Sequence, residues 1–261
     1  MGILYTFCVN SGNFAILSGE EEAIFIDSKL PREKEIIKEI VRGKNISGLI
    51  LSSFEEDHSE VDGVDFILSN YRPNWIMYPK FWKDEERFKK VFKAVIGVES
   101  SKKKVFKRVP VAAEKMVKGL NYASLERLSN NFSFVSFSPF LNDKGFIENH
   151  CLVLKIVEKT TQKSVLVTGD AEETRWKEMC AIYGKKLKSN ILQAPRHGFK
   201  DGITEEAFEL IDPQVVLISS FKEDAPYEAA KIYQKSFWFS TDSGRSFATL
   251  FTSDEIKTYR I

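Results

Sequence analysis

Short apolar runs rich in β-branched and aromatic residues recur along the whole chain. Most are bounded by glycine, proline, asparagine or aspartate, which favour turns. Two runs close together, as on either side of residues 158–163, indicate a β-hairpin. The runs predict strands at 4–9, 14–17, 23–26, 47–51, 75–78, 132–137, 151–157, 164–168, 190–193, 215–219, 237–240, 248–252 and 257–261.

Other segments place their apolar residues at intervals of three and four. The clearest is 81–96, where Phe88, Val91, Phe92 and Val95 recur at helical spacing. Such spacing gives a helix one apolar face, which packs against a sheet or another helix. Helices are predicted at 31–41, 64–70, 81–96, 172–183, 204–211 and 227–234.

The order of these elements predicts the architecture. Hairpins open the chain, strand–helix units fill the middle and return later, and the end is rich in strands. This order is typical of two sheets packed face to face with helices outside. The length of 261 residues, 43% of them hydrophobic, suits one α/β domain over residues 1–261.

Charge and cysteine usage narrow the partners and the compartment. A net charge of +1 provides no global field toward nucleic acid or an anionic membrane, so local charge would have to hold an anionic substrate. Cys8, Cys151 and Cys180 are odd in number and lack metal-like spacing, which indicates reduced thiols. No apolar stretch is long enough to span a bilayer, and no signal peptide is seen. We expect a cytoplasmic protein without a membrane partner.

All three histidines of the chain lie at or just beyond the ends of predicted strands. They are His58, His150 and His197, and Asp27 and Asp170 end two further apolar runs. Loops at strand ends are where α/β proteins place ligand-binding groups, so the pattern indicates a shared site. The alternative is five unrelated positions, because a single histidine is usually structural or on the surface.

The segment 52–58, Ser-Ser-Phe-Glu-Glu-Asp-His, resembles the His-x-His/Asp-x-Asp-His loop of the metallo-β-lactamase superfamily. More closely, the chain resembles the metallohydrolase domain attached to the DNA-uptake channel protein ComEC. Besides that loop, five segments match the motifs of this domain in order: 9–17, 24–27, 148–154, 166–170 and 192–198. The resemblance implies an αββα four-layer sandwich.

The resemblance also implies two adjoining metal pockets. One would be formed by Asp57, His58 and His197, with Asp170 bridging to the other. The other would use the residues at positions 53, 55 and 150, which are Ser53, Glu55 and His150. The candidate metal ligands are therefore Glu55, Asp57, His58, His150, Asp170 and His197. Asp27 would orient a histidine or the loop backbone.

Several positions depart from the family pattern. Serine is a poor neutral ligand, so Ser53 leaves the second pocket short of one group, and one metal is favoured over two. Arg196-His197 stands in place of a His-His pair, and Val61-Asp62-Gly63 replaces two glycines. His150 stands where close relatives commonly carry asparagine. The oxygen-rich ligand set suits zinc, with manganese or iron as alternatives.

A bound metal would supply hydroxide and polarise a phosphoryl oxygen, which favours a metal-dependent hydrolase of phosphodiesters, in nucleic acid or a nucleotide. Asp57 and Arg196 are the candidate catalytic residues, with Arg196 and the nearby Lys200 available to neutralise an anionic oxygen; Lys200 alone is as well explained as a surface cation. One alternative is a binding or scaffold subunit of a protein complex, on a degenerate fold without catalysis. Another is a thioesterase or lactonase, because one fold serves many chemistries.

One basic segment lies outside all of these motifs. The run 102–108, Lys-Lys-Lys-Val-Phe-Lys-Arg, would contact nucleic acid or else form a solvated loop or strand edge.

Overall fold

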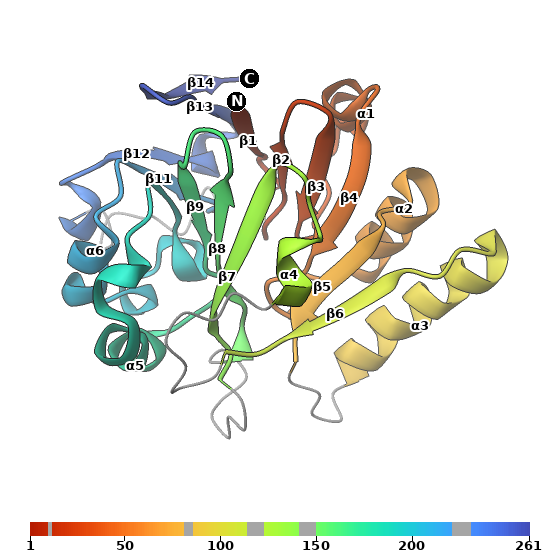
Figure 1. Cartoon of the computed structure of the whole chain (residues 1–261), viewed down its shortest axis with the longest axis horizontal. Helices are drawn as coiled ribbons and strands as arrows, with labels where there is room; N and C mark the ends of the chain where they lie inside the picture. Colours follow the sequence, from red (N-terminus) through yellow and green to blue (C-terminus); the bar gives the residue numbers. More distant parts are fainter. Residues whose placement is uncertain (10–11, 81–85, 114–122, 141–149, 221–230) are drawn as a thin grey trace.

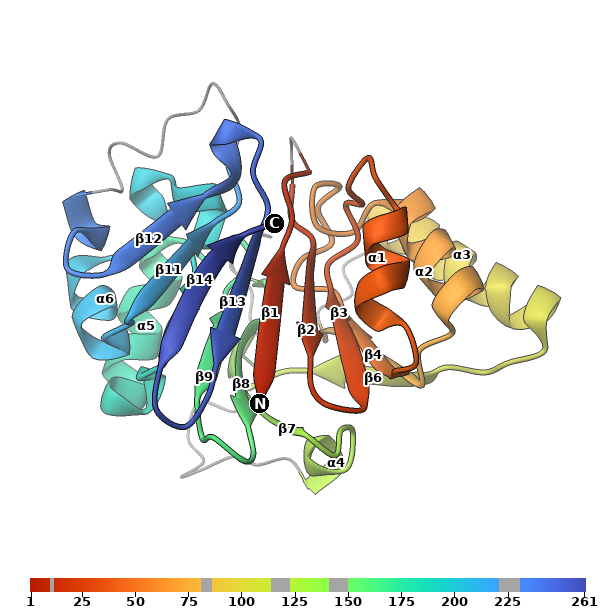
Figure 2. The same cartoon turned by 90° about the horizontal axis from the view of Figure 1, so that it is seen from above.

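The computed structural model describes residues 1–9, 12–80, 86–113, 123–140, 150–220 and 231–261 (Figure 1). Within them, two sheets face each other and helices cover both outer faces (Figures 1 and 2). The predicted αββα four-layer sandwich is confirmed. That residues 1–261 form a single domain stays a prediction.

The first sheet has eight strands in the order β14-β13-β1-β2-β3-β4-β5-β6. Its opening strands and the final pair are antiparallel, whereas β3 to β6 run parallel. The strands are β1 (Gly2–Thr6), β2 (Ala15–Ser18), β3 (Glu22–Ile26), β4 (Asn45–Ile50), β5 (Trp75–Pro79), β6 (Lys107–Val111), β13 (Phe247–Phe251) and β14 (Ile256–Arg260).

The second sheet has six strands in the order β12-β11-β10-β9-β8-β7. β7, β8 and β9 form antiparallel pairs, and β9 to β12 run parallel. The strands are β7 (Phe132–Ser138), β8 (Val153–Glu158), β9 (Ser164–Val167), β10 (Ile191–Gln193), β11 (Val215–Ile218) and β12 (Phe237–Ser240).

Strands alternate their side chains between the two faces of each sheet. In β3, Ile24 and Ile26 enter the core between the sheets, whereas Ala23 and Phe25 face the outer helices. In β11, Val215 and Leu217 likewise face the opposite sheet. Both faces are apolar because parallel strands inside a four-layer fold are covered on each side.

Helices close the outer faces. α1 (Glu35–Val41), α2 (Val61–Tyr71) and α3 (Glu86–Lys102) cover the eight-stranded sheet, and α5 (Glu173–Tyr183) and α6 (Glu205–Ile211) cover the six-stranded one (Figure 2). The short α4 (Ala123–Glu126) lies beside β7. In the described residues no helix is long and apolar enough to cross a membrane. Cys8, Cys151 and Cys180 are free thiols.

The sequence pattern misplaced a few boundaries. It predicted no strand at β6, because charged residues and Pro110 break the apolar pattern there; β6 is an edge strand, where proline is tolerated. β1 ends at Thr6, before the predicted residue 9. α3 continues to Lys102, and residues 81–85 of the predicted helix lie outside the described residues. So do residues 227–230 of the predicted final helix.

Candidate functional site

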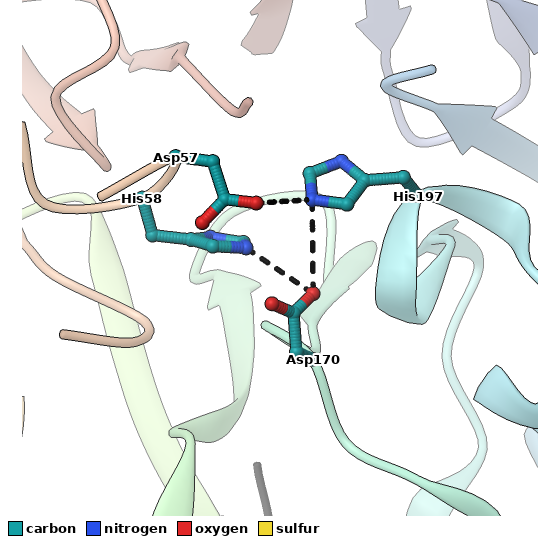
Figure 3. A group of neighbouring side chains, drawn as sticks. All are labelled: Asp57, His58, Asp170 and His197. Atoms are coloured by element: carbon teal, nitrogen blue, oxygen red, sulfur yellow. Dashed lines mark hydrogen bonds and ion pairs between the residues drawn. The ribbon is translucent and has the colours of Figure 1, made fainter. Parts of the chain in front are cut away.

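Four side chains from separate parts of the chain meet where parallel strands of the two sheets end. Asp57 and His58 lie on the loop after β4, Asp170 follows β9, and His197 lies in the turn η3 (Pro195–Gly198) after β10. Each offers one ligand atom, and these atoms all lie within 4.8 Å of one another (Figure 3). We call these four residues the acid–histidine cluster.

The two imidazoles and two carboxylates of the cluster point toward a common centre (Figure 3). His58 Nε2 lies 3.2 Å from Asp170 Oδ1. His197 Nε2 lies 3.1 Å from Asp57 Oδ2 and 3.8 Å from Asp170 Oδ1. Asp170 therefore faces both histidines, as expected of a carboxylate at the middle of a ligand set.

Asp27 fixes the orientation of His58. Its carboxylate is fully buried at the end of β3, and His58 Nδ1 lies 2.8 Å from its Oδ2. The backbone N–H of Ser52 donates to Oδ1 at 2.7 Å, and the Ser52 hydroxyl donates to Oδ2 at 2.8 Å. With Nδ1 turned to Asp27, His58 Nε2 faces Asp170 and the cluster.

A backbone carbonyl fixes His197 in the same manner. His197 Nδ1 donates to the carbonyl oxygen of Ser219, just beyond β11, at 2.7 Å. The turn that presents the ring has left-handed backbone at both Arg196 (φ 47°) and His197 (φ 53°). Left-handed backbone costs energy in residues other than glycine, and such strain is common at functional sites.

Asn13 joins the supports of the two histidines. Its Nδ2 donates to Asp27 Oδ2 at 2.6 Å, and its Oδ1 accepts from the Ser219 hydroxyl at 2.9 Å. Its backbone N–H also donates to the carbonyl oxygen of Asp57 at 2.8 Å. Asn13 lies inside the first matched motif, 9–17, but its residue type alone gave no reason to place it at the site.

The loop that carries Asp57 and His58 is held by its own serines and by α2. Ser53 Oγ accepts from the backbone N–H of Glu55 at 3.2 Å, and the Ser59 hydroxyl donates to the carbonyl oxygen of Ser53. Ser28 N–H donates to the carbonyl oxygen of His58 at 2.8 Å. Gly63 lets α2 approach Ser28 closely, because a Cβ there would lie 1.7 Å from the Ser28 carbonyl oxygen.

The cluster shifts the acidity of its own groups. Burial opposes the charged form of His58, but the carboxylates of Asp170 and Asp27 outweigh it and raise its pKa well above 6.5. Burial also opposes ionisation of Asp170, yet His58 and His197 hold the pKa of Asp170 below its usual value. For Asp57, the hydrogen bond with His197 outweighs burial and lowers the pKa.

Glu55 and His150 lie outside the acid–histidine cluster, although both are among the described residues. Burial, followed by the charge of Asp170, raises the pKa of Glu55 to about 7, so its carboxyl is close enough to interact with the cluster. His150 is buried ahead of β8. The structure thus brings together the residues of one predicted pocket, and Glu55 of the other pocket lies beside Asp170. That Glu55 and His150 are metal ligands stays a prediction.

Arg196 is turned toward carboxylates outside the cluster. Its guanidinium pairs with Glu172 and with Asp201, the latter at 2.7 Å. Its predicted role, neutralising an anionic oxygen, stays a prediction, and the two ion pairs would have to open for it.

The chemistry of the cluster fits a transition metal. His58 Nε2 and Asp170 Oδ1 are buried and form an ion pair at 3.2 Å, but neither atom has a hydrogen bond of regular geometry to a described group. Buried polar atoms are rarely left in this state, and a shared cation would satisfy both. Two imidazoles and two carboxylates are ligands for zinc, manganese or iron.

Comparison with solved structures identifies the fold. The metallo-β-lactamase fold protein YhfI from Bacillus subtilis superposes with a TM-score of 0.52 at 12% identity, covering 99% of this chain and all of that one. Human tRNase Z, short form, superposes with a TM-score of 0.50 at 12% identity, covering 92% and 96% of the two chains. The chain has the metallo-β-lactamase fold.

Sequence comparison gives a more particular likeness. The chain is 24% identical to ComE operon protein 3 of Bacillus subtilis (strain 168) over 181 residues, which are 69% of this chain but 21% of that protein. The resemblance to the ComEC-like metallohydrolase domain is thereby confirmed. The chain matches only about a fifth of the length of this relative. No family model matches it.

Proposed function

We propose that the chain is a metal-dependent hydrolase that cleaves phosphodiesters, with one metal held by Asp57, His58, Asp170 and His197. The acid–histidine cluster carries this proposal. Its four ligand atoms lie within 4.8 Å of one another, and each imidazole is held by a hydrogen bond at Nδ1, the ring nitrogen that points away from the cluster. Such outer supports are typical of metal-binding histidines.

A bound divalent metal would supply a nucleophile at neutral pH and polarise a phosphoryl oxygen. The residues of the chain would prepare that chemistry. Asp27 and the Ser219 carbonyl hold the two imidazoles through Nδ1, so that both Nε2 atoms face the centre. Asp57 is only partly buried, so it is the carboxylate nearest to solvent and to an entering substrate.

One metal is favoured over two. The second pocket would need position 53, where a serine hydroxyl caps the N–H of Glu55, together with Glu55 and His150, which lie outside the cluster. We therefore expect about one equivalent of metal per chain. The donor set favours zinc, and manganese or iron would also fit.

The substrate class rests on two supports. The resemblance to the metallohydrolase domain of a DNA-uptake protein favours nucleic acid, and a tRNase Z has the same fold. A thioesterase or lactonase would use the same metal chemistry. The second candidate is a non-catalytic binding or scaffold subunit of a protein complex. Ser53 and the ion pairs that engage Arg196 favour it.

Metal analysis of the purified and reloaded protein tests the site. We expect close to one equivalent of transition metal, and a content far below one would contradict the proposal. A panel of bis-p-nitrophenyl phosphate, single-stranded DNA, cyclic nucleotides and thioesters then tests the reaction. Turnover of the thioesters alone would replace the phosphodiester assignment. A loaded protein that cleaves none of them would favour the non-catalytic partner.

A further inference from the structure

We propose that residues 86–108, which form α3, β6 up to Arg108 and the turn between them, are a nucleic-acid-binding surface, the basic arm. They contain nine lysines and arginines and two glutamates, a net charge of +7. The whole chain has a net charge of only +1, so the remainder is negatively charged. A polyanion would therefore be attracted to this segment more strongly than to the remainder of the chain taken as a whole.

The charges of the basic arm are accessible. Lys90 and Lys93 lie on the exposed face of α3, and Lys102, Lys103 and Lys107 follow at its far end. Among the described residues none of these five forms an ion pair, whereas Lys89 and Arg108 pair with Glu86 and Glu99. Both cartoon views show the far end of α3 at the edge of the molecule (Figures 1 and 2).

The shape of the arm suits a nucleic-acid strand. α3 has 17 residues, which at 1.5 Å per residue gives a length of about 25 Å. A B-form strand places a phosphate about every 3.4 Å, so this length matches roughly seven phosphates. The exposed face of α3 is therefore long enough for several phosphate contacts at once.

An anionic membrane is the competing polyanion, and the apolar side chains of the arm argue against it. A helix that lies on a membrane inserts an apolar face into the lipid. Here that face is used internally, because Phe88, Val91, Val95 and Val98 pack in the core beneath the helix. Ile96 and Val105 are the large apolar side chains of the arm that remain exposed, at 52% and 80%.

The basic arm begins beside the loop that carries the acid–histidine cluster. The ring of Phe88 in the first turn of α3 makes an edge contact with Phe54, three residues before Asp57, at 4.7 Å between centroids. Lys90 lines a cavity of about 240 Å³ with this loop and the start of α2. That cavity also has Glu56, Glu60 and Asp62 in its wall, so phosphates would lie on the outer face of α3.

This inference rests on the proposed function in one respect: the arm would hold a polymeric substrate of the same site. The test measures binding of a fluorescein-labelled single-stranded oligonucleotide by anisotropy in EDTA, so that cleavage does not intervene. The test variant is K90E/K93E/K102E/K103E. The matched control is K185E/K186E, two exposed lysines of the turn η2 (Gly184–Leu187) on the side of the six-stranded sheet.

We expect the arm variant to bind the oligonucleotide at least about tenfold more weakly, with a flatter dependence of log Kd on log salt. The control should stay within about twofold of wild type, because its charges lie elsewhere. Equal binding by the arm variant and wild type would overturn the inference. So would arm-dependent binding to phosphatidylserine vesicles by a protein that does not bind the oligonucleotide.

Hydrolysis of bis-p-nitrophenyl phosphate separates this inference from the proposed function. The small diester needs the metal site but not the arm, so the arm variant should hydrolyse it as wild type does. Arm-dependent DNA binding without any phosphodiester hydrolysis would reject the proposed function and keep the surface. Phosphodiester hydrolysis together with DNA binding that does not depend on the arm would keep the proposed function and reject the surface.

Discussion

The amide nitrogen of Asn13 donates a 2.6 Å hydrogen bond to the buried carboxylate of Asp27. Because Asp27 orients His58 and the other end of Asn13 contacts Ser219, this one side chain links the supports of both histidines. We expect Asn13→Ala to weaken metal binding about 10- to 100-fold, as the loss of outer supports usually does. Competition with a chromophoric chelator measures it.

Asn70→Ala is the control, because Asn70 is an exposed asparagine that only donates to a carbonyl of its own helix. It should bind metal as wild type does. If Asn13→Ala unfolds at a lower temperature but keeps wild-type metal affinity, Asn13 is a structural residue and does not position the ligands.

Asp170 and Glu55 should respond differently to loss of charge. Asp170 faces both histidines, so Asp170→Asn should reduce bound metal to a small fraction of one equivalent. Glu55 lies outside the acid–histidine cluster, so Glu55→Gln should keep near-wild-type metal content. Both are measured by elemental analysis after gel filtration. Metal loss in Glu55→Gln equal to that in Asp170→Asn would show that the second pocket takes part.

Gly63 permits the contact between α2 and Ser28 that supports the loop carrying Asp57 and His58. A methyl group there would collide with the Ser28 carbonyl oxygen, so Gly63→Ala must push α2 outward. We expect a loss of about 1–3 kcal/mol in the free energy of unfolding, as for other overpacked sites. Urea denaturation measures this loss, and weaker metal binding should accompany it.

Gly97→Ala is the control for Gly63→Ala. Gly97 lies within α3, and a Cβ there would meet no atom within 4 Å. Gly97→Ala should therefore stabilise the protein by about 0.5–1 kcal/mol through helix propensity. Equal effects of the two substitutions would mean that the contact at Gly63 does not limit the packing of α2.

Lys155 should make the stability of the folded protein depend on pH. Burial lowers its pKa from 10.5 to about 8, while its ammonium donates to the carbonyl oxygen of Lys186. Between pH 8 and 10.5 the unfolded chain binds more protons than the folded one, so this group makes stability rise with pH. Lys155→Met should thus be more stable than wild type at pH 7, with a difference that shrinks toward pH 10.5.

Thermal unfolding across this range measures the difference. Lys177→Met, which removes an exposed lysine of α5, should show no comparable trend. A constant gap between Lys155→Met and wild type from pH 7 to 10.5 would contradict the lowered pKa.

Most of the fold could be predicted from sequence because it depends on local periodicity. Alternating and continuous apolar runs predicted nearly all the strands, since a covered sheet needs apolar residues on both faces. β6 escaped because only Val109 and Val111 are buried in it, whereas Lys107, Arg108 and Pro110 are exposed and break the apolar pattern. The boundary of β1 could not be read because Phe7 and Val9 are buried without being in the ladder.

The candidate site could be predicted only in part. Chemically suitable residues at strand ends indicated His58, His197 and Asp170, because parallel strands of a sheet deliver their ends to one edge. Whether Glu55 and His150 join them depends on side-chain direction, which the residue types do not determine. For Arg196, Glu172 and Asp201 lie 24 and 5 residues away, and only the fold shows that they engage it.

The sequence by itself determined the alternation that builds two covered sheets, the ligand types, and the serine that weakens the second pocket. These follow from composition and local spacing, which act within a few residues. The tertiary structure decided which ligands converge, which nitrogen of each histidine faces the cluster, and that Asn13 connects their supports. It also decided that the basic arm lies beside the loop that carries Asp57 and His58. These relationships join residues up to 206 positions apart, and only packing of the two sheets brings them within hydrogen-bond distance.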